Sequence, residues 1–209
     1  MIKEILHAAQ YAAWRHAGQV RKGVDAEPYI NHPLRVAYIL SGHIGGLEER
    51  WQKAMIVAAL LHDVIEDTPA TLQDLIDDVG PVAAHIVAEL SESDADKSAG
   101  TQENMGRRRL QARKLAKSSF AAKLVKIADQ IANVDDVAFR PPVGWSFQKR
   151  IDFVNGAEFL VDAIDVSFNS TAGYSEQDIS AFIGILKQFF TTADYARAHI
   201  RSLQTLGEA

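Results

Sequence analysis

Hydrophobic residues recur at intervals of three and four along most of the chain, which is the spacing of one face of an amphipathic α-helix. The first such segment, which we expect to be helical from residue 2 to about residue 17, contains Ile2, Ile5, Leu6, Ala9 and Ala13. The same spacing predicts a helix that continues from Pro33, a short one after Thr71, and helices over 47–65, 82–90, 105–117, 120–137, 147–168 and 179–190. We find no convincing strand, repeat or low-complexity tract, so the predicted fold class is all-α.

Polar residues, glycine and proline separate these segments. Thr68-Pro69 ends the helix predicted over 47–65, because proline disfavours a helical conformation in the residue before it. Thr71 is the expected N-cap of the next helix, and Asp74 three residues later resembles the second member of a capping box. The polar, acidic stretch 91–103 is predicted to be a surface loop.

Length and composition restrict the classes of protein that this chain can be. With 209 residues and 47% hydrophobic residues, it can form one compact core but not two ordinary domains. Its net charge of −5 argues against a nucleic-acid polymer as partner, but a small anion in a local basic pocket remains compatible with it. The longest apolar run, 54–61, is far too short to span a membrane, and no secretory signal is seen. We therefore expect a soluble cytoplasmic protein, with its oligomeric state left open.

The absence of cysteine limits the chemistry further. Without a cysteine, the chain has no disulfide, no zinc-thiolate site and no thiol nucleophile.

The strongest local signal for chemistry is His62-Asp63, followed by Glu66-Asp67, at the end of a predicted helix. His62 lies four residues after Ala58 and should share its buried face, with Asp63 turned by about 100° around the same helix. Burying so many ionisable groups together is costly unless a cation compensates their charge. The simpler interpretation is a solvated helix end, although acidic residues there oppose the helix dipole.

Two further residues complete a candidate set of ligands. His32 stands directly before Pro33, where a histidine taken alone is more often a structural residue than a ligand. Asp129 lies within an apolar helical segment, where a carboxylate needs a partner, either a basic side chain such as Lys126 or Arg109, or a bound cation. Two imidazoles and two carboxylates form a mixed nitrogen and oxygen set that suits manganese, iron or zinc better than magnesium or calcium.

Four segments then carry a specific resemblance to a known family. They are 13–22 (AWRHAGQVRK), 28–37 (PYINHPLRVA), 58–68 (ALLHDVIEDT) and 123–133 (KLVKIADQIAN). In this order they resemble the hydrolase (HD) domain of the RelA/SpoT homologues, and above all its small standalone members, the alarmone hydrolases. The resemblance runs from about residue 3 to residue 165. It implies a single HD domain over 1–165, on which a C-terminal helical extension, 166–209, is expected to pack.

The resemblance also implies roles for individual residues. One Mn²⁺ ion would be bound by His32, His62, Asp63 and Asp129. Glu66 and Asp67 would position and activate the attacking water. The implied substrate contacts are Arg21 and Lys22 for the base and phosphates, Asn133 for the nucleoside, and a basic residue farther on, Arg150 or its neighbour Lys149. The implied reaction is hydrolysis of the 3′-pyrophosphate of guanosine tetra- or pentaphosphate, which yields GDP or GTP and pyrophosphate.

Some positions depart from the family pattern and leave other hypotheses open. Gln130 stands where the family has a lysine, Asp136 replaces a small or hydroxyl residue, and Phe153 or Val154 replaces a tyrosine. One alternative is therefore hydrolysis of another phosphorylated nucleotide, such as NADPH or a nucleoside phosphate. Another is a nucleotide-binding regulator without turnover, although that class should have lost a ligand or the Glu66-Asp67 pair. The basic run 107–109 either reaches phosphates across a cleft or forms a solvated face.

Overall fold

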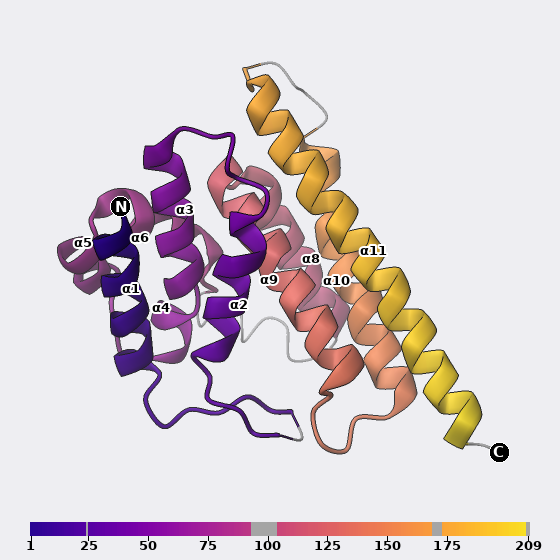
Figure 1. Cartoon of the computed structure of the whole chain (residues 1–209). Helices are drawn as coiled ribbons and strands as arrows, with labels where there is room; N and C mark the ends of the chain where they lie inside the picture. The colour runs from indigo at the N-terminus through magenta and orange to yellow at the C-terminus, as the bar shows by residue number, and fades with distance from the viewer. Residues whose placement is uncertain (24, 93–103, 169–172, 208–209) are drawn as a thin grey trace.

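Helices form all the regular structure of the residues described, which are 1–23, 25–92, 104–168 and 173–207 of a computed structural model (Figure 1). The helices are α1 (Ile2–Arg15), α2 (Asn31–Ser41), α3 (Glu49–Leu61), α4 (Val64–Asp67), α5 (Leu72–Val79), α6 (Pro81–Leu90), α8 (Asn104–Lys117), α9 (Phe120–Phe139), α10 (Phe147–Ser167) and α11 (Glu176–Gly207). The described residues contain no β-strand, but they form two isolated β-bridges, Val20 with Pro28 and Gly23 with Pro142. The predicted all-α fold class is confirmed.

Two of the predicted helices have the wrong extent. The segment predicted as one helix over 47–65 is two helices, because α3 ends at Leu61, a turn holds His62 and Asp63, and α4 begins at Val64. The last helix was expected over 179–190, but α11 extends to Gly207. The extension was missed because small residues form its buried face: Ala193 and Ala196 are buried and continue the spacing of three and four. Most of the loop predicted over 91–103 lies outside the described residues.

The local signals between α4 and α6 are confirmed. Thr71 is the N-cap of α5, and its hydroxyl accepts a hydrogen bond of 3.2 Å from the backbone N–H of Asp74. In return the backbone N–H of Thr71 donates to the Asp74 carboxylate at 2.7 Å, which completes the capping box. Gly80 separates α5 from α6 with a φ of +87°, a conformation that side-chain-bearing residues rarely adopt.

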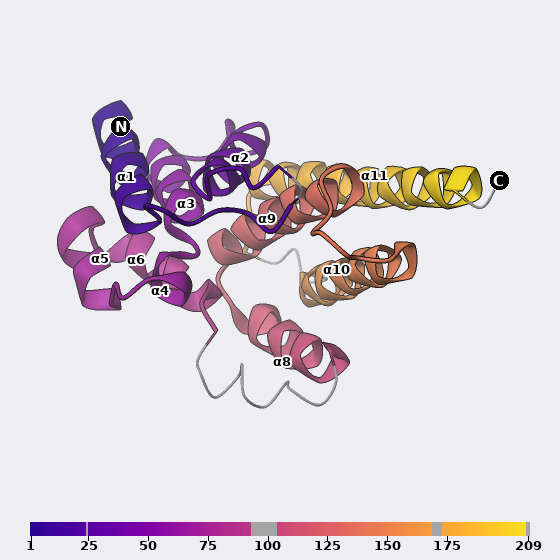
Figure 2. The same cartoon turned by 90° about the horizontal axis from the view of Figure 1, so that it is seen from below.

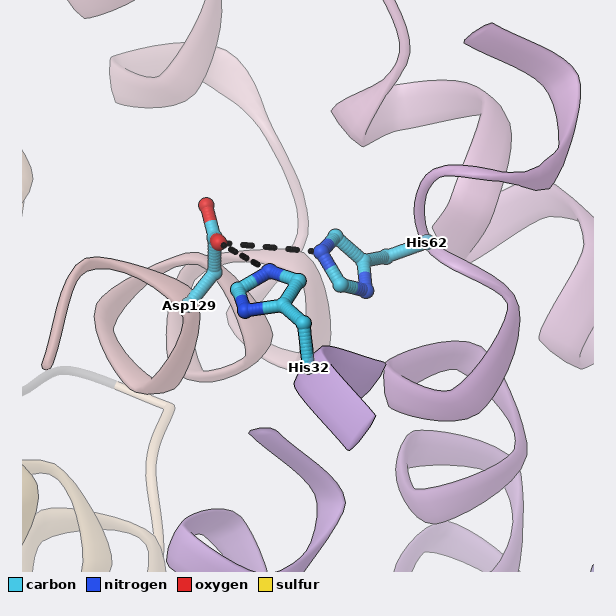
Figure 3. Close-up of side chains that lie close together, drawn as sticks. All are labelled: His32, His62 and Asp129. Carbon is cyan, nitrogen blue, oxygen red and sulfur yellow. Dashed lines mark ion pairs between the residues drawn. The ribbon is translucent and has the colours of Figure 1, made fainter. Parts of the chain in front are cut away.

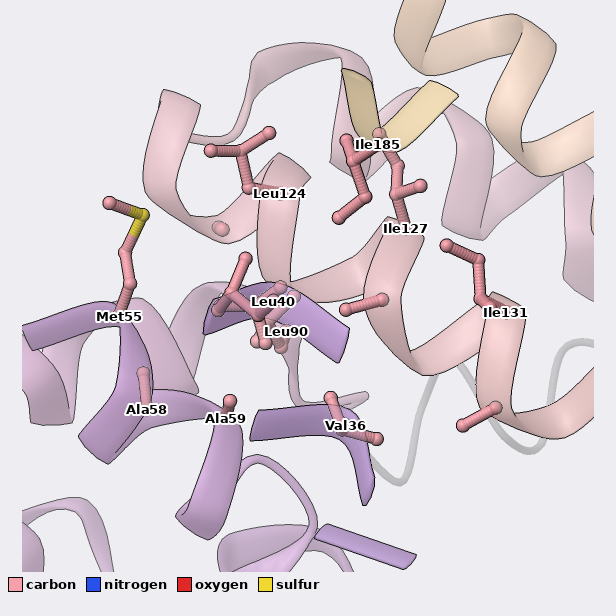
Figure 4. Packing of buried hydrophobic residues seen from close by; sticks show 14 of the residues in the cluster. Val36, Leu40, Met55, Ala58, Ala59, Leu90, Leu124, Ile127, Ile131 and Ile185 are labelled. Atoms are coloured by element: carbon pink, nitrogen blue, oxygen red, sulfur yellow. The ribbon is translucent and has the colours of Figure 1, made fainter. Parts of the chain in front are cut away.

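Helix α9 lies at the centre of the molecule, with α1 to α6 on one side of it and α8, α10 and α11 on the other (Figure 2). Nearly all of its length is buried, and it packs against α2, α3, α10 and α11. Leu124 and Ile127 of α9 meet Leu40 of α2, Met55 of α3 and Ile185 of α11 in one hydrophobic cluster (Figure 4). Each fully buried side chain of this size stabilises the fold by about 1.5–3 kcal/mol. A buried polar residue on α9 is therefore surrounded by the hydrophobic core of the protein.

Helix α11 shares this core. Phe182, Ile185 and Phe189 are almost fully buried and belong to the same cluster as the residues of α9. Helix α10 continues without a break across residues 165 and 166, where the boundary was expected. The division of the chain at that point stays a prediction. None of the helices in the described ranges is long and apolar enough to cross a membrane.

Candidate metal centre and cleft

Three predicted ligands come together from three separate helical segments. His32 lies in the first turn of α2, His62 in the turn after α3, and Asp129 in the middle of α9 (Figure 3). Each offers a ligand atom, and these atoms all lie within 4.8 Å of one another. Asp129 Oδ1 is 3.2 Å from His32 Nε2 and 3.6 Å from His62 Nε2. All three side chains are buried, so the group forms a compact centre away from bulk water.

Asp63, the fourth predicted ligand, borders the same centre. Its Oδ2 atom lies 3.1 Å from His62 Nε2 and 3.8 Å from His32 Nε2. The hydroxyl of Tyr29 donates to this oxygen at 2.7 Å and also to Asp67 Oδ2 at 3.1 Å. Tyr29 therefore connects a predicted metal ligand to a predicted catalytic carboxylate.

The orientation of His62 fits a metal ligand. Its Nδ1 lies 2.8 Å from the carbonyl oxygen of Ala59, an acceptor that only an Nδ1–H can satisfy. A hydrogen bond of this kind fixes the imidazole so that Nε2 presents its lone pair to a cation. Nε2 is buried and forms no hydrogen bond within the described residues, although two carboxylates lie within 3.6 Å of it. A buried nitrogen without a hydrogen bond, aimed at two carboxylates, is what a divalent cation would satisfy.

The surroundings of Asp129 keep its carboxylate ionised. Lys126 Nζ and Gln130 Nε2 donate to Oδ2 at 2.8 and 3.0 Å, and Asn133 Nδ2 donates to Oδ1 at 2.5 Å. Burial opposes the charged form, but Lys126 and the two imidazoles outweigh it and hold the pKa of Asp129 well below its usual value. Gln130, a departure from the family pattern, thus still donates to the predicted ligand.

The two histidines differ in their electrostatics. Burial opposes protonation of His62, but the carboxylates of Asp63 and Asp129 outweigh it and raise its pKa to about 10. At His32 burial dominates and lowers the pKa. Without an ion, His62 therefore carries a proton at neutral pH, and a binding cation must displace that proton.

Glu66 and Asp67 lie on the short helix α4, and both line the cleft beside the metal centre. Glu66 accepts a hydrogen bond of 3.5 Å from the backbone N–H of Glu92, and its Oε1 lies 3.8 Å from an Nη atom of Arg107. The backbone carbonyl of Asp67 accepts a hydrogen bond of 3.0 Å from Gln19. The break after α3 thus places the acidic pair on its own short helix, facing the loop that precedes α2.

The cleft has a volume of about 1320 Å³, and its lining includes three of the predicted substrate contacts, Arg21, Lys22 and Asn133. Arg21 donates to Asn133 Oδ1 at 2.8 Å and to Asp136 Oδ2 at 2.7 Å. Its guanidinium carbon also lies 5.6 Å from the centre of the Tyr29 ring. These contacts fix one side of the guanidinium, and the residue still borders the cleft.

The structure does not bring Arg150 to the cleft. Its side chain is only 5% exposed, and its guanidinium donates to the backbone carbonyls of Val137 at 3.1 Å and Ala138 at 2.6 Å. Its donors satisfy carbonyl groups at the end of α9, and the role of Arg150 as a substrate contact stays a prediction. The neighbouring Lys149 lines the cleft instead, with its ammonium 4.7 Å from the Trp145 ring.

Several residues that contact the predicted site were not singled out from the sequence. Tyr29 joins two acidic residues of the site, and its ring stacks on His16 with centroids 4.7 Å apart. Its position, three residues before His32 on the approach to a helix, was the available signal. Arg35 and Arg140 both bind Asp136 together with Arg21. Arg140 lies one helical turn after Asp136, whereas only the fold brings Arg21 and Arg35 to this carboxylate.

Comparison with known proteins first identifies the class. The family model described as the HD domain matches residues 8–149. Because this match covers more than half of the chain, the chain belongs to the HD domain family. A protein of known structure from Listeria monocytogenes EGD-e shares the fold, with a TM-score of 0.55 and 23% identity over 82% of this chain and 97% of that one.

Individual similar proteins then show to which group of HD domain proteins the chain belongs. The chain is 38% identical over 159 residues to the guanosine-3′,5′-bis(diphosphate) 3′-pyrophosphohydrolase MESH1 of Drosophila melanogaster, an alignment that covers 76% of this chain and 83% of that protein. It is 41% identical over 160 residues to the MESH1 protein of Xenopus tropicalis, with 77% and 84% covered. A solved structure described as a metazoan ortholog of SpoT that hydrolyzes ppGpp has a TM-score of 0.67 and 32% identity, covering 88% of this chain and 94% of that one. The chain therefore belongs to the MESH1-like family, and the resemblance found in its motifs is confirmed.

Proposed function

We propose that this protein is a metal-dependent hydrolase that removes the 3′-pyrophosphate from guanosine 3′,5′-bis(diphosphate) and related alarmones. The observation that carries the proposal is the buried group of His32, His62 and Asp129, which opens beside an acidic pair into a cleft with basic residues. The products are GDP or GTP and pyrophosphate. The similarity to proteins named for this activity, over more than three quarters of the chain, supports the choice of substrate.

The residues that would hold the cation are His32, His62, Asp63 and Asp129. We favour Mn²⁺ because two imidazoles with two carboxylates suit a transition metal better than an ion that prefers oxygen alone. When bound, such an ion lowers the pKa of a coordinated water and polarises a phosphoryl oxygen. Lys126, Gln130 and Asn133 keep the Asp129 carboxylate oriented, and the Ala59 carbonyl does the same for His62.

The acidic pair Glu66 and Asp67 acts on the attacking water. Glu66 and Asp67 orient this water toward the 3′-diphosphate and accept its proton. Tyr29 holds Asp67 in place, because its hydroxyl donates to that carboxylate at 3.1 Å. Arg21 offers a flat face for the base, and Lys22 supplies a point charge for phosphate. These cations neutralise a strongly anionic substrate within a protein whose net charge is −5.

The test is product analysis with a panel of nucleotides. Protein loaded with Mn²⁺ is incubated with guanosine tetraphosphate and, in parallel, with NADPH and nucleoside phosphates, and the products are separated by anion-exchange chromatography. We expect GDP and pyrophosphate in equal amounts from the first substrate, with the highest kcat/KM of the panel. A folded, metal-loaded protein that releases no pyrophosphate from guanosine tetraphosphate contradicts the proposal. A clear preference for another compound of the panel would show that this compound, and not the alarmone, is the substrate.

A variant pair distinguishes turnover from binding. Glu66→Gln removes a proton acceptor, so turnover should fall by about 100-fold or more while calorimetry still detects nucleotide binding. Glu49→Gln is the matched control, because Glu49 is an exposed glutamate in the first turn of α3, outside the residues that line the cleft. Turnover that survives in Glu66→Gln would show that this residue does not accept the proton.

A further inference from the structure

The structure separates the three arginines that follow one another at the start of α8. Arg107 is bound to Glu92, with an N···O distance of 2.8 Å. Arg109 is exposed and is not among the residues that line the cleft. Arg108 is half-buried and lines the cleft that also contains Glu66 and Asp129. The three arginines are thus neither a uniform solvated face nor a uniform basic patch. Arg107 and Arg108 both line the cleft, but Arg107 has an acidic partner, whereas Arg108 forms no ion pair within the described residues.

A notch on α10 receives the Arg108 side chain. Helices α8 and α10 pack against each other, and the guanidinium carbon of Arg108 lies 5.4 Å from the centre of the Phe153 ring (Figure 2). A Cβ atom added at Gly156 would overlap Cζ, Nε and Nη1 of Arg108. The guanidinium therefore occupies the space that a side chain at position 156 would fill. This contact gives a reason for a glycine inside a helix, where glycine is otherwise unfavourable.

The charge of Arg108 has no counter-ion among the described residues. No carboxylate of that part of the chain forms an ion pair with it, and the charged group that acts on it is another cation, Arg107. Burial, and after it the charge of Arg107, lower the pKa of Arg108. A half-buried guanidinium that aromatic contact alone stabilises is costly to keep, unless an anion binds to it.

A second cation lies on the same wall of the cleft. Lys149 is 4.7 Å from the Trp145 ring, and the Trp145 and Phe153 rings are 5.8 Å apart. Two cations on two adjacent aromatic rings thus border one side of the cleft. The guanidinium has the fork of donors that binds phosphate oxygens in pairs, whereas the ammonium adds a point charge.

We propose that Arg108, placed by Phe153 and Gly156, is a substrate-binding residue that takes a phosphate group of the nucleotide on the α8–α10 wall of the cleft. The identity of the ligand rests on the proposed function. The phosphate belongs either to the 5′-diphosphate, which remains on the product, or to the pyrophosphate that is released. The chemistry of recognition is the same for both.

Binding measurements in a variant without turnover test this assignment. In the Glu66→Gln background with Mn²⁺, calorimetry gives the Kd of guanosine tetraphosphate, GDP and pyrophosphate, with and without Arg108→Ala. We expect Arg108→Ala to weaken guanosine tetraphosphate binding by about tenfold or more, the effect of one charge-assisted hydrogen bond. Weaker binding of GDP assigns the residue to the 5′-diphosphate, and weaker binding of pyrophosphate assigns it to the leaving group.

Two further variants separate a role in binding from a role in folding. Arg109→Ala removes the same charge from an exposed position of the same helix and should leave every Kd within twofold. Gly156→Ala fills the notch and should weaken the same ligand as Arg108→Ala, while the Tm stays equal or rises because alanine favours the helix. The inference is overturned if Arg108→Ala leaves all three Kd values unchanged, or if Arg109→Ala weakens them equally. Because these measurements need no turnover, failure of the proposed reaction would be seen separately.

Discussion

The Tyr29 hydroxyl is a single donor shared by two acidic residues of the site. It lies 2.7 Å from Asp63 Oδ2 and 3.1 Å from Asp67 Oδ2. Burial, and after it the charge of Asp63, raise the pKa of Tyr29, so the phenol keeps its proton over the physiological pH range. The residue therefore positions one carboxylate relative to the other and needs no ionisation of its own.

Replacing Tyr29 by phenylalanine removes this donor and keeps the ring that stacks on His16. We expect a loss of about 10- to 100-fold in kcat or in Mn²⁺ affinity, the usual effect of losing a hydrogen bond that orients a metal ligand. Steady-state kinetics over a series of Mn²⁺ concentrations would measure both quantities. Tyr38→Phe, at a tyrosine that is 80% exposed, is the matched control. Equal metal affinity and equal kcat in both variants would remove Tyr29 from the positioning role.

At the scale of residues, the sequence predicted which side chains are buried better than it predicted which residues they contact. His62 was placed on a buried face by its spacing from Ala58, and both residues are buried in the structure. Tyr29 was not assigned to the site, because its contacts with Asp63 and Asp67 depend on how separate segments pack. For Lys149 and Arg150 the sequence offered two adjacent cations. A helix turns by about 100° per residue, so only the rotation of α10 decides which of them faces the cleft.

Among the elements, the break between α3 and α4 is the clearest example of what periodicity does not resolve. Apolar residues continue through the break, since Leu61 and Val64 are both fully buried. A turn of two residues, His62 and Asp63, separates α3 from α4 without interrupting this pattern. The sequence predicted which residues face the interior, and it missed the turn because both conformations bury the same side chains.

Asp136 connects three elements through one carboxylate. It binds Arg21 from the loop before α2, Arg35 from α2, and Arg140 at the end of α9. Burial opposes its charge, but these guanidinium groups outweigh burial, Arg140 and Arg21 most strongly, and lower the pKa of Asp136. The carboxylate therefore holds the loop that carries Arg21 and Lys22 against the helix that carries Asp129.

The stability contributed by Asp136 should depend on pH with a defined sign. Because its pKa is lower in the folded state than in the unfolded state, the contribution is fully present above the unfolded value and is lost as pH falls through the folded value. Asp136→Asn should therefore lower Tm by several degrees at pH 7, and the difference from wild type should shrink toward pH 3. Thermal melts followed by circular dichroism over this range would measure it. In contrast, Asp77→Asn, on the exposed face of α5, should leave Tm within about one degree throughout. A Tm difference for Asp136→Asn that stays constant from pH 7 to pH 3 contradicts the assigned role.

For the whole molecule, the metal centre joins parts of the chain that are distant in sequence. Its predicted ligands come from residue 32, the segment 62–63 and residue 129, on elements that pack against the same core. A cation that binds only this folded arrangement must stabilise the entire fold.

Removal of the metal should therefore lower the Tm. At a free Mn²⁺ concentration 100 times Kd, binding contributes about 2.7 kcal/mol, which corresponds to a shift of roughly 5–10 °C for a chain of this size. Differential scanning calorimetry after chelation and after readdition of Mn²⁺ would measure the shift. His32→Ala should abolish most of it, whereas His85→Ala, at an exposed histidine of α6, should keep it. An equal Mn²⁺ shift in both variants would place the ion elsewhere.

The wide spacing of the ligands along the chain also has a consequence for biosynthesis. During translation the chain emerges from its N-terminus at about 5–20 residues per second, so His32 and His62 leave the ribosome several seconds before Asp129. Until α9 follows, the predicted ligands of the first 63 residues lack both Asp129 and the buried helix against which α2 and α3 pack. The predicted metal site can thus be completed only late in the synthesis of each chain, and a chain truncated before residue 129 would lack a complete site.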